Sequence, residues 1–249
     1  MILSTVLAMM IILIAASVRG YSGFGFALIG VAGLSIISAP NVAIPTVLVL
    51  EIIVGLLLLP PVWREISWRP VLLLLAGAIV LTPVGAYFLI HVPTDVARIG
   101  IALAISAAAL LLLFAAKPRS SQSTSSTSST VATGAVAGLL NGAFGISGPP
   151  IVLFFMSGER AAGVSRASMM ACFLVLDVIA VTSFAIGGLV DRSVLITALL
   201  CLPVLALGSW LGHRAFHGSN SDRFRTRVLW LLLVLAFVTG IQGLLAFVR

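Results

Sequence analysis

A glycine-rich interruption of a hydrophobic stretch is the first place in the chain where residue types could do chemistry. The uncharged segment from Asn141 to Ser157 reads NGAFGISGPPIVLFFMS. It carries three evenly spaced glycines, Gly142, Gly145 and Gly148. Such glycines favour a sharp reversal or a close backbone approach, and Pro149 and Pro150 suit the first turn of a helix. We expect a helix to start near Pro149, with unpaired N–H groups near Ser147 that could bind an anion. The alternative is that the glycines only let helices pack closely.

Two acidic residues stand in the middle of hydrophobic segments. Glu51 ends the sequence LVLE, and Asp177 ends the similar sequence LVLD. Glu51 lies about ten residues into its segment, roughly 15 Å deep at 1.5 Å per residue. A carboxylate at the centre of a membrane helix costs about 2.5 to 3.5 kcal/mol to insert, which makes both acids candidate functional groups. One interpretation is proton coupling, because burial favours the neutral form of a carboxyl group. The other is a structural hydrogen bond between helices.

Basic residues near these positions offer charge for an anion. Arg19 precedes a glycine-rich sequence, RGYSGFGF, at the position that matches Asn141, and it could meet an anion if the break lies deep in the membrane. Arg166 begins the segment that leads to Asp177. For both arginines the alternative is that the side chain extends to the lipid headgroups, and for Arg166 we favour that alternative.

The remaining reactive side chains suggest no metal site, cofactor or catalytic group. The histidines fall at segment ends or in loops, where a solvated side chain is usual: His91, His213 and His217. Cys172 and Cys201 lie in hydrophobic runs without a CxxC spacing, so we interpret them as small apolar residues.

The composition requires a membrane environment. Of the 249 residues, 61% are hydrophobic and 8% are charged, which leaves too little polar surface for a soluble protein. The net charge of +7 comes from basic residues clustered in short loops, a pattern typical of membrane topology rather than of nucleic-acid binding. The N-terminal apolar run has no Lys or Arg before it, so we expect a retained first helix and not a signal peptide.

Charges, glycines and prolines divide the chain into ten apolar segments. They cover approximately residues 2–18, 23–39, 41–59, 70–90, 99–116, 131–146, 149–157, 166–187, 193–212 and 228–247. Most are long enough to cross the hydrocarbon core as helices. Between them lies a Ser/Thr-rich stretch without periodicity. We therefore expect an N-terminal repeat over 1–116, a linker over 117–130 and a C-terminal repeat over 131–249.

The two halves match each other at similar offsets. Gly20 and Gly23 precede Gly142 and Gly145 by 122 positions, and Glu51 corresponds to Asp177. Further pairs lie at similar offsets: Gly85 with Gly208, Asp95 with Asp222, and Arg98 with Arg225. The sequence therefore predicts an internal repeat.

Basic residues predict how the segments cross the membrane. If every segment changes side, eleven Lys and Arg residues fall on one side: Arg19, Arg64, Arg69, Lys117, Arg119, Arg160, Arg166, Arg214, Arg223, Arg225 and Arg227. Three fall on the other: Arg98, Arg192 and Arg249. Counting each glycine-broken pair as one crossing gives eight spans, and the same residues without Arg19, which then lies inside the break, divide about evenly between the two sides. We expect an all-α fold of two inverted five-segment repeats, with both termini outside the cytoplasm. Because segment 149–157 is too short to span, the first two segments of each half should form a re-entrant hairpin.

At this point the chain resembles the TauE/SafE family of sulfite and organosulfur anion exporters over nearly its whole length. The resemblance rests on the doubled hydrophobic half, GYSGFGFALIG from Gly20, GAFGISGPPIVL from Gly142, the Ser/Thr linker and GSWLG from Gly208. It implies a multi-pass protein of the cell inner membrane that transports a small anion, such as sulfite or a sulfonate, driven by an ion gradient. A homodimer is compatible with the sequence.

We expect the anion to bind where the two glycine breaks converge near the midplane. The expected substrate-binding residues are Arg19, Ser22, Gly23, Gly25, Asn141, Gly142, Gly145, Ser147, Gly148 and Pro149. Glu51 and Asp177 are the residues expected to couple transport to an ion or proton gradient. A positive φ at Gly148 would make a valine there unfavourable. A passive anion channel shares every feature except the need for the two acids. An intramembrane serine hydrolase using Ser147 would require a histidine at the same depth, and none lies in mid-segment.

Overall fold

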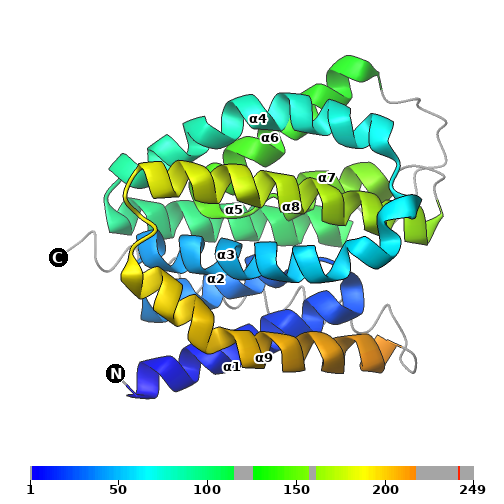
Figure 1. The fold of residues 1–249 in the computed structure, drawn as a ribbon. Helices are drawn as coiled ribbons and strands as arrows, with labels where there is room; N and C mark the ends of the chain where they lie inside the picture. Colours follow the sequence, from blue (N-terminus) through cyan, green and yellow to red (C-terminus); the bar gives the residue numbers. More distant parts are fainter. Residues whose placement is uncertain (1, 115–125, 157–160, 217–240, 242–249) are drawn as a thin grey trace.

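The computed structural model describes residues 2–114, 126–156, 161–216 and 241, and the described regular structure is helical (Figure 1). The α-helices are α1 (Ile2–Ser22), α2 (Phe26–Ile37), α3 (Pro40–Leu58), α4 (Trp68–His91), α5 (Thr94–Phe114), α6 (Thr127–Phe144), α7 (Gly148–Met156), α8 (Ala162–Ile186) and α9 (Arg192–Phe216). A short 3-10 helix, η1 (Pro60–Glu65), joins α3 to α4. The expected all-α class is confirmed for these residues.

Nine of the ten apolar segments correspond to these helices, and the tenth, 228–247, lies outside the described residues except at position 241. Three helices, α5, α6 and α8, begin four or five residues before the predicted segments, and α6 begins at Thr127 and not near residue 131. Ser126 explains the earlier start, because its hydroxyl accepts the Ser129 N–H and caps the helix. The last Ser/Thr residues of the predicted linker are therefore the first turn of a helix.

The outer surface of the bundle fits a lipid environment. Among the described residues, five helices are long and apolar enough to cross a membrane: α3, α4, and the parts of α5, α8 and α9 that cover Thr94–Leu111, Gly163–Ile186 and Arg192–Gly212. Large apolar side chains are exposed along them, among them Leu72, Val80, Leu103 and Leu199. An apolar surface of this extent is stable only against lipid or another protein.

The helix connections lie at two opposite ends of the bundle (Figure 1). One end holds the α3–α4 connection, the start of α8 and the end of α9, with Arg64, Arg69, Arg166 and Arg214; we call it the basic end. The opposite end holds the start of α1 and the α4–α5 and α8–α9 connections.

The strongest helix pairs join the two halves of the chain. α1 packs against α9, and α6 packs against α4. Glycines bring the backbones together: a Cβ atom at Gly142 of α6 would lie 2.0 Å from the Thr82 carbonyl oxygen, and one at Gly212 of α9 would lie 2.0 Å from the Ser17 carbonyl oxygen. Each half therefore completes its packing with a helix from the other half.

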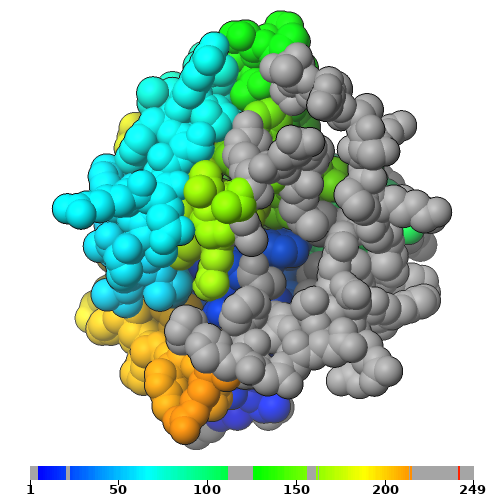
Figure 2. All heavy atoms as spheres, turned by 90° about the vertical axis from the view of Figure 1, so that its right-hand side faces the viewer, coloured from blue at the N-terminus to red at the C-terminus, as the bar shows by residue number. Residues whose placement is uncertain are grey.

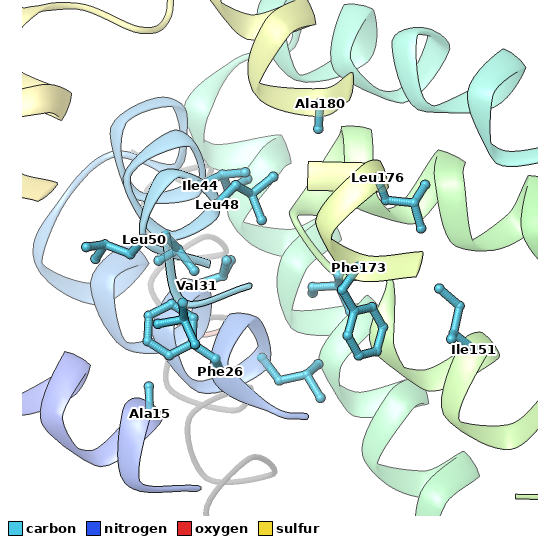
Figure 3. Close-up of a cluster of buried hydrophobic side chains, with 14 of the residues drawn as sticks. Ala15, Phe26, Val31, Ile44, Leu48, Leu50, Ile151, Phe173, Leu176 and Ala180 are labelled. Carbon is cyan, nitrogen blue, oxygen red and sulfur yellow. The ribbon is translucent and has the colours of Figure 1, made fainter. Parts of the chain in front are cut away.

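Buried apolar side chains between these pairs form one core. Figure 3 shows part of it, where side chains from α2 and α3, including Val31, Ile44 and Leu48, lie across from Phe173 and Leu176 of α8. Burial of these side chains fixes α3 and α8 in the centre of the molecule. The two mid-segment acids are carried on those helices.

Candidate functional site

The first break in the helices lies at Gly23–Gly25, between α1 and α2. Gly23 has φ 79° and Gly25 has φ 94°, a left-handed conformation that other residues rarely adopt. The Gly23 N–H donates to the Arg19 carbonyl oxygen at 2.7 Å and closes the last turn of α1. The chain therefore reverses at this point because glycine stands there.

The second break, Gly145–Ser147 between α6 and α7, repeats this arrangement. Gly145 has φ 67°, and its N–H donates to the Asn141 carbonyl oxygen at 2.8 Å. The Ile146 N–H donates to the Leu140 carbonyl oxygen at 3.3 Å, as in many glycine-terminated helices. The predicted helix break is confirmed, and the helix expected near Pro149 begins at Gly148.

Gly148 differs from the expectation. Its φ is not positive, and a Cβ atom there would meet no atom within 4 Å. The condition for backbone strain in a valine at Gly148, a positive φ, is therefore not met, and in the second break a side chain would be strained at Gly145 instead. The open space beside Gly148 lies at the N-terminal turn of α7, where N–H groups have no partner within the helix.

Arg19 and Glu51 form an ion pair in the interior. The Arg19 Nη1 atom donates to the Glu51 Oε1 atom, and the two side chains are 1% and 6% exposed. The Nε and Nη2 atoms of Arg19 are also buried, and neither has a hydrogen-bond partner. A buried guanidinium with two unpaired donor atoms is unusual, because each such group loses its hydration on burial.

Asn141 and Asp177 form the corresponding contact in the second half. The Asn141 Nδ2 atom donates to the Asp177 Oδ1 atom at 3.2 Å, and both residues are buried. The Asp177 Oδ2 and Asn141 Oδ1 atoms are buried without a hydrogen-bond partner. This pair carries at most one charge, whereas the Arg19–Glu51 pair joins an acidic and a basic side chain.

The two pairs make up one polar cluster, consisting of Arg19, Glu51, Asn141 and Asp177. Asp177 is close enough to interact electrostatically with both Glu51 and Arg19. The cluster joins the end of α1 to the end of α6 through α3 and α8, so it lies beside both breaks. The structure thus brings together four of the expected site residues.

Arg166 lies near the first break. A Cβ atom at Gly23 would come within 3.0 Å of the Arg166 Nε atom and 3.1 Å of its Cγ atom. Arg166 also interacts electrostatically with Arg19. The favoured expectation placed this side chain among lipid headgroups, but the structure packs it on the turn at Gly23.

The other expected residues divide between the breaks and the helix contacts. Ser147 is buried within the second break, and Pro149 is buried in the first turn of α7. Gly142 lies against the backbone of α4, which is the close-packing role described as the alternative. The side chain of Ser22 lies outside the described residues.

A cavity of about 120 Å³ lies elsewhere, at the end opposite the basic end. It is formed by the start of α1, the end of α2, the start of α3 and α9, with hydroxyls from Thr5, Ser38, Thr46 and Thr197. None of the expected site residues lines it.

The histidines do not provide a base for Ser147 within the described structure. His91 is exposed at the end of α4, where its Nδ1 atom lies 2.8 Å from the Tyr87 carbonyl oxygen. The side chain of His213 and all of His217 lie outside the described residues. Among the described residues no group of His, Cys, Asp and Glu is arranged to hold a metal ion.

Reasoning from the sequence missed both pairings inside the polar cluster. Residues 32 and 36 positions apart form them, and no local pattern connects such positions. A usable signal was present, because buried charges in membranes pair with each other, and Arg19 and Glu51 were the charges predicted deep in the first half.

Comparison with known proteins supplies independent information. The family model described as "Sulfite exporter TauE/SafE" matches residues 8–239. A protein from Cupriavidus necator, named "Probable sulfite/organosulfonate exporter TauE", is 27% identical over 158 residues, which cover 63% of this chain and 61% of the relative. The match therefore spans less than two thirds of that relative's length. No solved structure matches the chain.

Proposed function

Because the chain belongs to the TauE/SafE family of sulfite exporters, we propose that it is a secondary transporter that moves a small sulfur oxyanion out of the cell. The named relative suggests sulfite or an organosulfonate as the substrate. The observation that carries the proposal is the polar cluster, because buried ionisable groups within a membrane bundle usually mark a transport pathway.

The anion binds at the two breaks. Arg19 supplies positive charge with two unpaired buried donor atoms, and the first turn of α7 supplies unpaired N–H groups beside the open space at Gly148. Ser147 adds a hydroxyl group at the same break. N–H and hydroxyl donors hold an anion without a full charge of their own, which also allows the anion to leave.

Asp177 carries the coupling proton. Its Oδ2 atom has no partner, so it can take a proton without breaking the hydrogen bond from Asn141 to Oδ1. Glu51 acts through Arg19, whose position its carboxylate fixes. Loss of either carboxylate therefore disturbs coupling, by different routes.

The repeats are inverted, and each begins with a re-entrant hairpin. In support, α1 packs on α9 as α6 packs on α4, which is the exchange that a two-fold axis within the membrane plane produces. The ends of α4 and α9 also carry matching pairs, Tyr87 with His91 and Trp210 with Arg214, at opposite ends of the bundle. At nine residues, α7 is too short to span the membrane.

Cysteine labelling tests this topology, with the basic end in the cytoplasm. Ser126 and Ser193 are exposed at the starts of α6 and α9, whereas the native Cys172 and Cys201 are buried and should react slowly. An impermeant thiol reagent outside intact cells should label Ser193→Cys and should not label Ser126→Cys until the cells are opened. The reverse pattern would show that the orientation is wrong.

Transport in proteoliposomes tests the function. With an imposed pH gradient, the wild-type protein should accumulate sulfite or an organosulfonate, and Asp177→Asn and Glu51→Gln should not. Asp95→Asn is the matched control, because Asp95 is a partly exposed acid at the start of α5. If the wild-type protein conducts the anion only down its gradient, it is a passive channel. If both variants accumulate the anion normally, the acids have a structural role.

A further inference from the structure

Two arginines meet at the turn of the first break, and this arrangement needs an explanation. The Gly23 N–H donates to the Arg19 carbonyl oxygen, and the Arg166 side chain packs against Gly23. Arg19 of α1 and Arg166 of α8 interact electrostatically, and both carry a positive charge. Like charges repel strongly where water is largely excluded. Arg19 is 1% exposed, so its charge is poorly screened.

The described carboxylates do not neutralise both arginines directly. Glu51 pairs with Arg19 through the Nη1 atom, and Asp177 accepts its hydrogen bond from Asn141. The ion pairs found among the described residues join Arg19 to Glu51 and Arg98 to Asp95, and neither includes Arg166. The two arginines, with the Nε and Nη2 atoms of Arg19 unpaired, therefore leave donor capacity for an anion.

The turn at Gly23 creates the space for this arrangement. The Arg166 side chain lies against the backbone of Gly23, at the place that a side chain at this position would fill. Gly23 therefore has two roles, because its left-handed conformation reverses the chain and its missing side chain admits the second guanidinium.

The position of Arg166 also suggests the direction of approach. Arg166 is partly exposed near the start of α8, at the basic end, whereas Arg19 is buried. Figure 2 looks onto that end and shows blue atoms from the N-terminal part of the chain beside yellow-green atoms at the centre of the face. An anion entering there would meet Arg166 before Arg19.

We propose that Arg166 and Arg19 form a two-guanidinium binding site for the transported oxyanion at the Gly23 turn. This site selects a divalent anion over a monovalent anion that carries the same SO₃ group. The proposal rests on the proposed transport function and specifies its substrate class. A guanidinium presents several N–H donors in one plane, so two of them can contact different oxygens of one SO₃ group. Replacing one negative charge of the anion by a methyl group removes much of the benefit of the second guanidinium.

Calorimetry on the full-length purified protein tests the proposal with two anions, at mildly alkaline pH, where sulfite is largely divalent. Sulfite and methanesulfonate share an SO₃ group and differ in charge. The wild-type protein should bind sulfite more tightly. Arg166→Gln should weaken sulfite binding about tenfold, equivalent to about 1.4 kcal/mol, and should change methanesulfonate binding less than about threefold.

Two further variants separate the outcomes. Arg69→Gln removes an exposed arginine at the same end and should leave both affinities unchanged. Arg166→Lys keeps the charge but loses the planar arrangement of donors, so it should bind sulfite with intermediate affinity. This variant replaces Arg166→Gln in the measurement if Arg166→Gln does not fold. Unchanged sulfite binding in Arg166→Gln, or an equal loss in Arg69→Gln, would overturn the two-guanidinium site while the transport function stands. Failure of the wild-type protein to bind either anion would instead contradict the proposed function.

Discussion

The two halves of the molecule place different chemistry on the same backbone. Arg19 and Asn141 each stand four residues before a left-handed glycine whose N–H donates to their carbonyl oxygen. Each side chain then contacts the acid in the middle of the third helix of its half. In the first half the contact is an ion pair, and in the second it is an amide with a carboxyl group.

Because the two contacts differ, one can hold a charge while the other gains or loses a proton, as the proposed mechanism requires. Removal of the Glu51 carboxylate would leave the Arg19 guanidinium buried without a counter-ion. Protonation of Asp177 leaves only a neutral amide beside it. In the proposed mechanism, the first half therefore holds a charge and the second half changes its protonation.

The largest expected effect comes from removing the cation of the first half. Arg19→Gln leaves Glu51 buried and unpaired, which should cost about 3 to 5 kcal/mol of stability. Asn141→Ala removes a neutral donor and should cost about 1 to 3 kcal/mol. Thermal unfolding of the purified variants measures both effects. The double variant Arg19→Gln/Glu51→Gln should recover much of the loss, and equal losses in the two single variants would contradict the contrast between the halves.

Glycine substitutions at the second break should have smaller effects that depend on position. Gly142→Ala would place a Cβ atom 2.0 Å from the Thr82 carbonyl oxygen and force α4 and α6 apart, at a cost of about 1 to 3 kcal/mol. Gly148→Ala meets no atom within 4 Å and should change stability by less than about 0.5 kcal/mol.

Gly148→Val should separate folding from binding. Its side chain would extend into the open space beside α7, so the variant should unfold like the wild-type protein and bind sulfite more weakly. Wild-type affinity in Gly148→Val would place the anion away from the second break.

The smallest expected effect concerns how the fourth helix of each half begins. Asp191 accepts the Val194 N–H at 2.9 Å and the Ser193 hydroxyl at 2.7 Å, whereas Ser67, before α4, makes no such side-chain cap. The bond from the Val194 N–H, followed by that from Ser193, holds the pKa of Asp191 below its usual range. The ionised side chain therefore stabilises α9 above the usual Asp pKa of about 3.9, and this contribution is lost as the pH falls through the lowered pKa.

Melting temperatures at two pH values check this effect. Asp191→Asn should melt slightly below the wild-type protein at neutral pH, and the difference should disappear in strong acid. Ser67→Ala should show no pH-dependent difference. A difference for Asp191→Asn that persists in acid would show that the charge of Asp191 is not what stabilises α9.

Local patterns predicted the helices and breaks, because glycine and proline act on the backbone where they stand. The break at Gly145 and the new helix close to Pro149 follow directly from these residues. The start of α6 at Thr127 was missed because Ser and Thr are common both in linkers and in helix caps.

The candidate site was predicted only in part, because its contacts depend on tertiary packing. The sequence singled out Arg19, Glu51, Asn141 and Asp177, but not which residue contacts which. Arg166 was assigned to the lipid headgroups because a basic residue at the end of a segment usually extends there. Its contact with Gly23 depends on how α8 lies against the first break, which no spacing along the chain reveals.

The packing of α1 against α9 also has a consequence for how the chain is made. α9 begins about 170 residues after α1 ends, whereas only about 35 residues separate α4 from α6. At a synthesis rate of about 5 to 20 residues per second, α1 waits roughly 10 to 35 s for its partner helix, and α4 waits only a few seconds. During that interval α1 carries Arg19 without α9 beside it, and for the first part of it only helices of the first half have been made. Early pairing of Arg19 with Glu51, both within the first 51 residues, would shield this charge while the ribosome completes the second half.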